Sequence, residues 1–476
     1  MQSEPHITYN SRLGFECIML LVLLGGVIFI FIELSLQSYT VYAYAYHPYY
    51  LPYLPTTLLP TSFPVTNSIA PTLQLPTAAL TFPPVTSPPA IILTMIPSHI
   101  PTLTSTPTAP IITTLLLQTL AIGKKHTCAL QVDQTVYCVG NGLDGQLANG
   151  LFSNMIVPVK AIVSENISEI TAGEFFTCFL TQNSSTLCSG NSDMYQLGTN
   201  STNASNVPLF VISDVNTISS GDGGTCIVTN MGAVKCWGKN TEGELGTGTI
   251  TNVVVPTVVT GFETFGAMRV SIGFSHGCVL DIGGVIHCSG RGVDGQLGDG
   301  LQTPSTIPVQ AYGLTNQVDV QCGSYHTCSI ANDGLVRCWG SGANGQLGTG
   351  DVLVRTVPAE FALFSFHVQY MSSGDGSTCA LLFTLSKIEC VGKNVAGQHG
   401  TNSTHIVSTT FDTFGVFEDY IFMQNKYERV CGMRPTGEVF CAGTNDDGQL
   451  GDGNMPNNAH IPIMMQFFPA TVAPTL

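Results

Sequence analysis

From residue 121 onward the chain is predicted to fold as an all-β propeller of seven blades, and three observations predict this. Pairs of cysteines recur seven times, with 48 to 52 residues between the first cysteines of successive pairs. A glycine stands two residues after the second cysteine of every pair, and a Gly-Gln-Leu-Gly run follows it at 295–298, 345–348 and 448–451. A unit of about fifty residues with several strands cannot bury both faces of its own sheet, so seven such units are expected to stack into a ring.

Each cysteine pair is predicted to lie on a β-hairpin. In the fifth unit, Cys328 and Cys338 flank a turn of Asn332, Asp333 and Gly334, in which the glycine is free to take a positive φ. If Asp333 is the apex, the two cysteines lie directly opposite each other. The glycines of the Gly-Gln-Leu-Gly run are expected where backbone packs on backbone.

The composition divides the chain into five segments. They are a short N-terminal tail (1–16), a transmembrane signal anchor or signal peptide (17–37), a Pro/Thr/Ser-rich stalk (38–120), the propeller (121–470) and a C-terminal tail (471–476).

The apolar segment 17–37 is predicted to export the propeller. Residues 17–32 carry no charge, and the apolar stretch resumes after Glu33, so an uncleaved helix is long enough to span a bilayer. The alternative is a signal peptide cleaved after Ala45. The propeller is then extracellular or luminal on a membrane anchor, or secreted if the segment is cleaved.

The stalk is predicted from the absence of charge and the density of proline. No Asp, Glu, Lys or Arg lies in 34–123, and fifteen prolines lie between Pro48 and Pro110. Such a chain favours extended polyproline-like structure. Its Ser and Thr content is typical of an O-glycosylated stalk, with a plain linker as the alternative.

The charge of the repeats argues against a nucleic-acid partner. From residue 121 onward there are 14 Lys or Arg against 28 Asp or Glu. An acidic domain has no electrostatic footprint for phosphate backbones.

The repeats resemble the regulator of chromosome condensation repeat family, whose units combine a His-Thr-Cys start, an Asp-Gly turn, a Cys-Trp-Gly segment and a Gly-Gln-Leu-Gly close. Residues 323–351 carry all four features. The resemblance implies a seven-bladed propeller. The units depart from the pattern at 194–198, at 397–400 and at Lys426, where irregular blade rims are expected.

Members of that family perform different functions on the same ring, so the resemblance alone assigns none. The founding member is a nuclear exchange factor for a small GTPase, to which an exported chain has no access. A plant UV-B photoreceptor uses clustered tryptophans, whereas this chain has only Trp237 and Trp339. Exported members that bind proteins, including a β-lactamase inhibitor, fit the export segment best.

Three roles are open for the paired cysteines. Export and opposite positions on a hairpin favour disulfides. Buried free cysteines are the second role, and metal ligands, for which the ten-residue spacing is too wide, are the third. The pairs predicted as disulfides are Cys128 with Cys138, Cys178 with Cys188, Cys226 with Cys236, Cys278 with Cys288, Cys328 with Cys338, Cys379 with Cys390, and Cys431 with Cys441.

No catalytic, cofactor or metal site is predicted. His126, His276 and His326 recur two residues before a cysteine and are expected to hydrogen-bond locally rather than to form a ligand set. Asp299-Gly300 and Asp452-Gly453 lack the ligand density of a calcium loop and are expected to be turns. No nucleophile elbow, zinc-protease motif or phosphate loop occurs.

Five Asn-x-Ser/Thr sequons are predicted glycosylation sites if the host is eukaryotic: Asn166, Asn183, Asn200, Asn203 and Asn402.

The sequence therefore predicts a non-enzymatic scaffold that recognises an unknown protein or surface glycan through one rim of the propeller. An exported enzyme or enzyme inhibitor with a site at the propeller mouth is the alternative, followed by a guanine-nucleotide exchange factor. Clustered side chains with shifted pKa values at the mouth would favour the enzyme, and a loop-built rim with exposed aromatic residues would favour the scaffold.

Overall fold

The computed structural model describes ten stretches of the chain: 16–23, 27–35, 38–44, 117–131, 134–263, 266–361, 368–383, 385–403, 405–415 and 417–466. The chain divides into two compact units, Met1–Pro107 and Thr108–Leu476. The described part of the first unit is an antiparallel sheet of β1 (Glu16–Leu23), β2 (Val27–Ser35) and β3 (Ser38–Tyr44).

The anchor predicted over 17–37 falls in the first unit, where the described backbone is strand. Within the described stretches, no helix is long and apolar enough to cross a membrane. Residues 45–116, which hold most of the predicted stalk, lie outside the described residues, as do 1–15 and 467–476. The anchor, the stalk and the location that they imply stay predictions.

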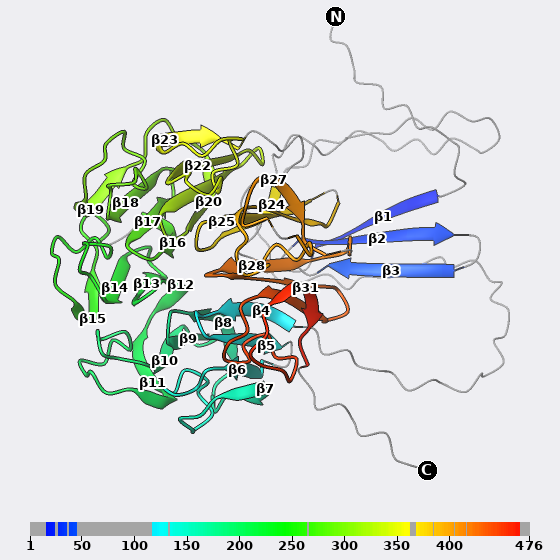
Figure 1. The fold of residues 1–476 in the computed structure, drawn as a ribbon, viewed down its shortest axis with the longest axis horizontal. Helices are drawn as coiled ribbons and strands as arrows, with labels where there is room; N and C mark the ends of the chain where they lie inside the picture. The colour runs from blue at the N-terminus through cyan, green and yellow to red at the C-terminus, as the bar shows by residue number, and fades with distance from the viewer. Residues whose placement is uncertain are drawn as a thin grey trace, which may run out of the picture. The chain divides into compact units, whose positions relative to one another are not determined.

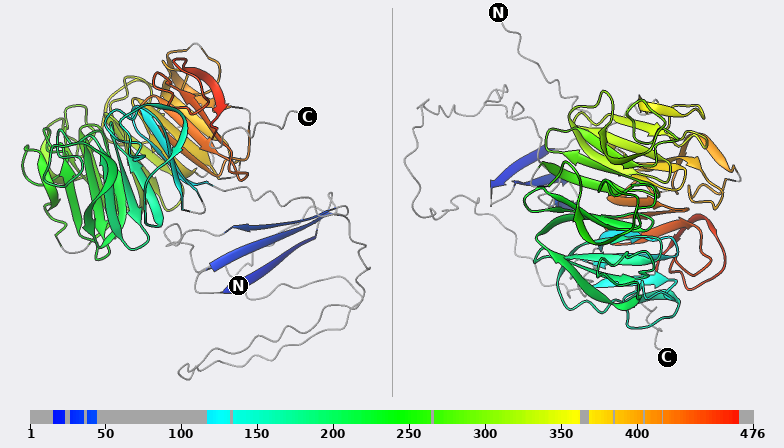
Figure 2. Two further views of the ribbon diagram at one scale, coloured as in Figure 1. Left: turned by 90° about the horizontal axis from the view of Figure 1, so that it is seen from below. Right: turned by 90° about the vertical axis from the view of Figure 1, so that its left-hand side faces the viewer.

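Residues 117–466 form seven antiparallel sheets of four strands each, and each sheet uses four consecutive strands (Figure 1). The first strands of successive blades contact one another around the centre, and blade 7 lies beside blade 1 (Figure 2). No strand is exchanged between these two sheets, so side chains and loops close the ring. The predicted seven-bladed all-β propeller is confirmed.

The strands of each blade follow one another with similar lengths. Blade 1 comprises β4 Leu117–Ile122, β5 His126–Gln131, β6 Val136–Gly140 and β7 Met155–Lys160, and blade 2 comprises β8 Ile167–Ala172, β9 Phe176–Thr181, β10 Ser185–Gly190 and β11 Ser205–Ser213. Blade 3 comprises β12 Val215–Ser220, β13 Gly224–Thr229, β14 Val234–Gly238 and β15 Val253–Val258, and blade 4 comprises β16 Ala267–Ile272, β17 His276–Asp281, β18 Ile286–Gly290 and β19 Ser305–Gln310. Blade 5 comprises β20 Gln317–Cys322, β21 His326–Ala331, β22 Val336–Gly340 and β23 Arg355–Glu360. Blade 6 comprises β24 Val368–Ser373, β25 Ser377–Leu382, β26 Ile388–Lys393 and β27 Val407–Thr413. Blade 7 comprises β28 Phe422–Lys426, β29 Arg429–Met433, β30 Val439–Gly443 and β31 Ala459–Met464.

The antiparallel order gives the propeller two different faces. The loop face carries the turns between first and second strands, such as 123–125, and the long loops between third and fourth strands, such as 141–154. The hairpin face carries the turns between second and third strands and the connections between blades. The described propeller begins at Leu117 and ends after Met464, both on the hairpin face, so the long loops lie at the opposite ends of the strands.

Apolar side chains between neighbouring blades form the core. Leu147, from the long loop of blade 1, belongs to one buried cluster with Ile167 and Phe179 of blade 2. Burying one such side chain stabilises the fold by about 1.5–3 kcal/mol. The repeated leucine is therefore an inter-blade contact, which explains why a single unit cannot fold alone.

The predicted irregularities do not interrupt the sheets. In blade 2, Gln196 Oε1 still accepts the Met194 amide at 2.8 Å, and Tyr195 takes the left-handed φ of 64° where other units have glycine. In blade 6, His399 occupies the buried leucine position, and its Nδ1 lies 2.8 Å from Asp412 Oδ2.

Candidate functional site

Glycine lines the central opening on the loop face in six of the seven blades. At Gly221, an added Cβ would lie 2.2 Å from the carbonyl oxygen of Gly273, and at Gly273 it would lie 2.2 Å from that of Gly323. Such distances exclude any side chain unless the blades separate. The backbone of one blade therefore packs directly on that of the next around the axis.

Lys426 takes this position in the seventh blade and its side chain crosses the opening. Its Nζ donates hydrogen bonds to the carbonyl oxygens of Ala172 (2.5 Å) and Ser220 (2.6 Å), in blades 2 and 3. Burial lowers the pKa of Lys426 to about 8, while the Asp222 carboxylate acts in the opposite direction. The departure noted in the sequence is thus a side chain that fills the opening.

The space left at the opening is small. A cavity of 20 Å³, lined by Asp222, Phe274, Ser373, Lys426 and Tyr427 among others, has room for about one water molecule. The opening contains groups with shifted pKa values, because burial also raises the pKa of Asp222 to about 6. The cavity of 20 Å³ is too small to hold an organic substrate.

Arg429 closes the ring between blades 7 and 1. It is fully buried, and its guanidinium donates to the carbonyl oxygens of Lys124 (3.1 Å), His126 (3.0 Å) and Gly123. Burial lowers its pKa to about 9. Gln424 Oε1 accepts the Ile122 amide at 2.8 Å beside it. Sequence reasoning missed this role, although Arg429 stands where three other units have histidine.

The three repeated histidines bond to the following blade. The Nε2 atoms of His126, His276 and His326 lie 2.8, 2.8 and 2.9 Å from the hydroxyls of Thr177, Thr327 and Thr378. Burial lowers their pKa values to about 3, 3 and 4, so they are neutral. The expected hydrogen bonds are present, but their partners lie in the next blade, 51 or 52 residues along the chain, rather than nearby in the same unit.

The Gly-Gln-Leu-Gly run and the tryptophans serve the same inter-blade packing. The Gln296 carbonyl oxygen in blade 4 accepts from Thr327 Oγ1 and from Trp339 Nε1 of blade 5, each at 2.9 Å. Trp237 Nε1 donates in the same way to the Gln196 carbonyl oxygen at 2.9 Å. Both tryptophans are fully buried.

The seven cysteine pairs have the predicted geometry. Within each pair the cysteines are directly cross-strand, for example Cys328 opposite Cys338. Their Cα atoms lie 4.0–4.1 Å apart and their sulfurs at bonding distance, which is compatible with disulfides. Cys322 is a buried free thiol, and burial raises its pKa to about 12. The oxidation state of the pairs in the natural protein stays a prediction.

All five sequons are solvent-exposed. Asn166 and Asn183 lie on the hairpin face of blade 2, whereas Asn200 and Asn203 of blade 2 and Asn402 of blade 6 lie on the loop face. Glycosylation stays a prediction that this exposure permits.

The predicted Asp-Gly turns are confirmed. The Asp299 carboxylate accepts the Leu301 amide at 3.0 Å, and the Asp452 carboxylate accepts the Asn454 amide at 3.2 Å.

An aromatic strip lies on the loop face over blades 3 to 5, formed by Lys239, Phe274, Arg291 and Tyr325. The ring centroids of Phe274 and Tyr325 are 5.7 Å apart, and the two rings are 37% and 36% exposed. Lys239 Nζ lies 4.6 Å from the Phe274 ring centre, and the Arg291 guanidinium lies 5.8 Å from that of Tyr325. Cations over aromatic faces hold such rings in place at the surface.

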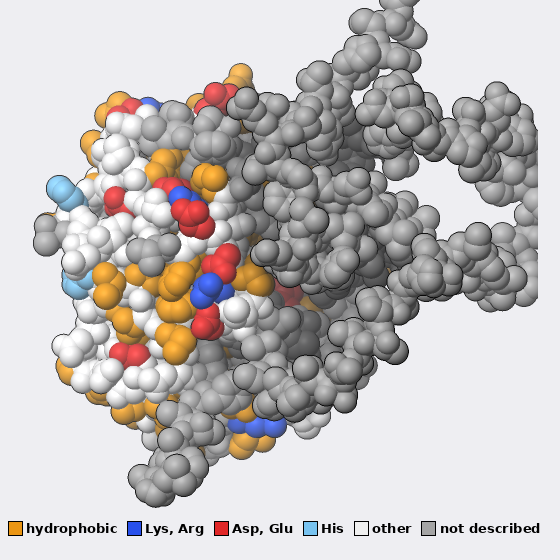
Figure 3. All heavy atoms as spheres, turned by 90° about the vertical axis from the view of Figure 1, so that its right-hand side faces the viewer, with side chains coloured by type: hydrophobic (Ala, Val, Ile, Leu, Met, Phe, Trp, Pro, Cys, Tyr) orange, Lys and Arg blue, Asp and Glu red, His pale blue; other side chains and the backbone are white. Residues whose placement is uncertain are grey.

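Exposed apolar side chains also lie on the long loops of blades 3 to 5. They include Ile250, Val293, Leu301, Val352, Leu353 and Val354. Elsewhere on the propeller, the side chains seen in Figure 3 are mixed, with hydrophobic groups between small clusters of acidic and basic ones. The loop face therefore offers apolar and aromatic contacts that differ from blade to blade.

Comparison with known proteins agrees with the repeats. Two models of the regulator of chromosome condensation (RCC1) repeat match the chain. One matches residues 215–244 and 317–346, and the other matches residues 232–280, 283–330 and 333–381. A search of curated protein sequences finds no match.

Solved structures share the fold at low identity. Human WBSCR16 is 19% identical with a TM-score of 0.62, over 70% of this chain and 93% of that one. Prp20p of Saccharomyces cerevisiae, studied with its binding to Gsp1p and histones, is 17% identical with a TM-score of 0.63. The match covers 74% of this chain and 88% of Prp20p. Yeast RCC1 (Prp20) bound to Kap60 is 16% identical with a TM-score of 0.63. The match covers 79% of this chain and 91% of the yeast protein. Residues 117–466 are therefore a seven-bladed β-propeller that contains regulator of chromosome condensation (RCC1) repeats, which the family models match within residues 215–381.

Proposed function

We propose that this protein is an extracellular or luminal scaffold that binds another protein through the loop face of its propeller. The aromatic strip carries this proposal. Its two exposed rings are held by cations, Phe274 lies at the filled central opening, and the long loops of the same blades carry exposed apolar side chains. Aromatic and arginine side chains on a rigid frame are typical of binding hot spots.

The two faces differ in their fitness for this role. The chain enters and leaves the described propeller on the hairpin face, opposite the loop face that carries the strip. The loop-face sequons lie on blades 2 and 6, which flank the strip over blades 3 to 5.

A non-enzymatic role belongs to the same proposal. The cavity at the central opening has room for about one water molecule, and Lys426 is engaged by two carbonyl oxygens. Binding across a surface of loops needs no such cavity. Prp20p, whose propeller is similar, was studied with protein partners, which favours a protein over a glycan as the ligand.

The experiment compares two double variants of the full chain displayed on cells. Phe274→Ser with Tyr325→Ser removes the strip, and Met231→Ser with Ile282→Ser removes two more exposed apolar residues from the hairpin face. We expect proximity labelling to lose its main partner only in the first variant. Loss only in the second variant would move the binding site to the hairpin face, and labelling unchanged in both would refute recognition through the strip.

A further inference from the structure

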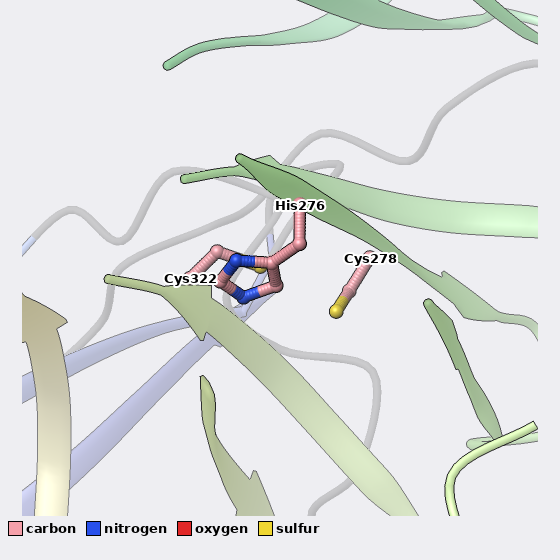
Figure 4. Close-up of side chains that lie close together, drawn as sticks. All are labelled: His276, Cys278 and Cys322. Carbon is pink, nitrogen blue, oxygen red and sulfur yellow. The ribbon is translucent and has the colours of Figure 1, made fainter. Parts of the chain in front are cut away.

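Three residues with metal-binding atoms converge between blades 4 and 5. They are His276 and Cys278 of β17 and Cys322 of β20 (Figure 4). One ligand atom of each lies within 4.8 Å of the others, and all three residues are buried. Cys322 is unpaired in the sequence pattern, and folding brings it to the cysteine pair of the preceding blade.

Among the described residues, only the interface between blades 4 and 5 holds a third thiol beside a cysteine pair. Cys322 stands six residues before the first cysteine of its unit. The same position in the other units holds a residue without sulfur: Ile122, Ala172, Ser220, Ile272, Ser373 and Asn425. Blades 1 and 5 contain the same histidine and cysteine pair as blade 4, so they provide matched comparisons within one chain.

The atoms of the cluster have spare bonding capacity. Nδ1 of His276 is buried without a hydrogen-bond partner, while Nε2 lies 2.8 Å from Thr327 Oγ1. Cys322 Sγ donates to the Ser271 carbonyl oxygen at 3.3 Å. Cys278 Sγ lies at bonding distance from Cys288 Sγ, so a metal ion can use these sulfurs only after the pair is reduced.

We propose that reduction of the Cys278–Cys288 pair creates a site for one zinc-like cation. His276, Cys278 and Cys322, which the fold already brings together, are three of its ligands, and Cys288, released from Cys278 by the reduction, moves in as the fourth. Two molecules of a thiol reductant supply two electrons and two protons to the pair and leave as a disulfide. The metal ion then displaces the protons of the three thiols. Three thiolates and one imidazole form a closed tetrahedral set of the kind found in structural zinc sites.

The disulfide and the metal exclude each other because they use the same two sulfurs. The disulfide links two strands within blade 4, whereas the metal links blade 4 to blade 5 through Cys322. Reducing conditions would therefore replace a bond within one blade by a bond between two blades.

The test titrates the reduced full-length chain with Co²⁺, a spectroscopic probe of tetrahedral thiolate sites, in the presence of a chelator that removes weakly held metal. We expect one equivalent, with thiolate-to-cobalt absorption and a raised unfolding temperature. Cys322→Ser should lower the affinity more than about tenfold. Serine occupies this position in blades 3 and 6, so the variant should keep its fold, which circular dichroism checks.

A gain-of-site variant provides the opposite test. Ser373 faces the His326, Cys328 and Cys338 set of blade 5 as Cys322 faces that of blade 4. Ser373→Cys should therefore add a second equivalent. Equal binding by the parent and Cys322→Ser chains, no added equivalent in Ser373→Cys, or a reduced chain that unfolds without binding cobalt would each overturn the proposal.

Discussion

Replacing Arg429 with methionine tests how the ring is closed. The guanidinium is fully buried between blades 7 and 1 and donates to three backbone carbonyl oxygens of blade 1. Methionine keeps much of the length and the apolar contacts of the side chain but removes its charge and all its donors. The variant therefore isolates the hydrogen bonds of the closure from its packing.

The expected loss of stability follows from the backbone carbonyl groups that no longer have a hydrogen-bond donor in the variant. The His126 carbonyl oxygen also accepts the Gly123 amide at 3.0 Å and stays paired, whereas the carbonyl oxygens of Gly123 and Lys124 lose the Arg429 donor. Gly123 is buried, and a buried unpaired carbonyl group costs about 1–3 kcal/mol, whereas Lys124 is exposed. Removing the buried charge of Arg429 offsets part of this cost. We expect Arg429→Met to lower the free energy of unfolding by about 1–3 kcal/mol.

Denaturant unfolding followed by tryptophan fluorescence measures this change. The two tryptophans of the chain, Trp237 and Trp339, are both buried in the propeller, so the signal reports that unit. Arg355→Met is the control, because its partner Asp351 is a surface residue and such exposed ion pairs contribute little to stability. An Arg429→Met midpoint equal to that of the parent chain, or equal to that of the control, would refute the assigned closure.

Three other predictions concern pH and covalent state. Because burial lowers the pKa values of His126, His276 and His326, the unfolded chain binds more protons below pH 6.5. Stability should therefore fall as the pH drops towards 4, by about 1.4 kcal/mol per histidine at pH 5.5. His326→Ser should reduce this loss by roughly a third in acid unfolding curves, and an unchanged curve would contradict the neutral buried state. Because the pKa of Lys426 is lowered to about 8, the unfolded chain binds more protons at this site from pH 8 upward, so stability should rise towards pH 10. A Lys426→Met chain that rises equally would exclude this origin. Non-reducing peptide mapping with glycan release should find seven disulfides within hairpins and sugars on the stalk. Free thiols without sugars would place the propeller in the cytosol and restore an exchange-factor role.

Repetition made most of the fold predictable from the sequence. A feature that recurs in seven units, such as the cross-strand position of Cys328 and Cys338, is set by local hairpin geometry and needs no knowledge of distant residues. The glycines before six of the seven pairs were also visible in the sequence. Their reason, direct backbone contact between neighbouring blades, became clear only in the assembled ring.

The tertiary structure decided the features that occur once. Lys426 replaces a repeated glycine, Arg429 stands where three other units have histidine, and Cys322 is a cysteine at a position that varies among the units. Their partners lie 254, 305 and 51 residues away along the chain, at Ala172, Lys124 and Ser271. Only the packing of seven sheets around one axis brings these groups together, because it determines which blades become neighbours.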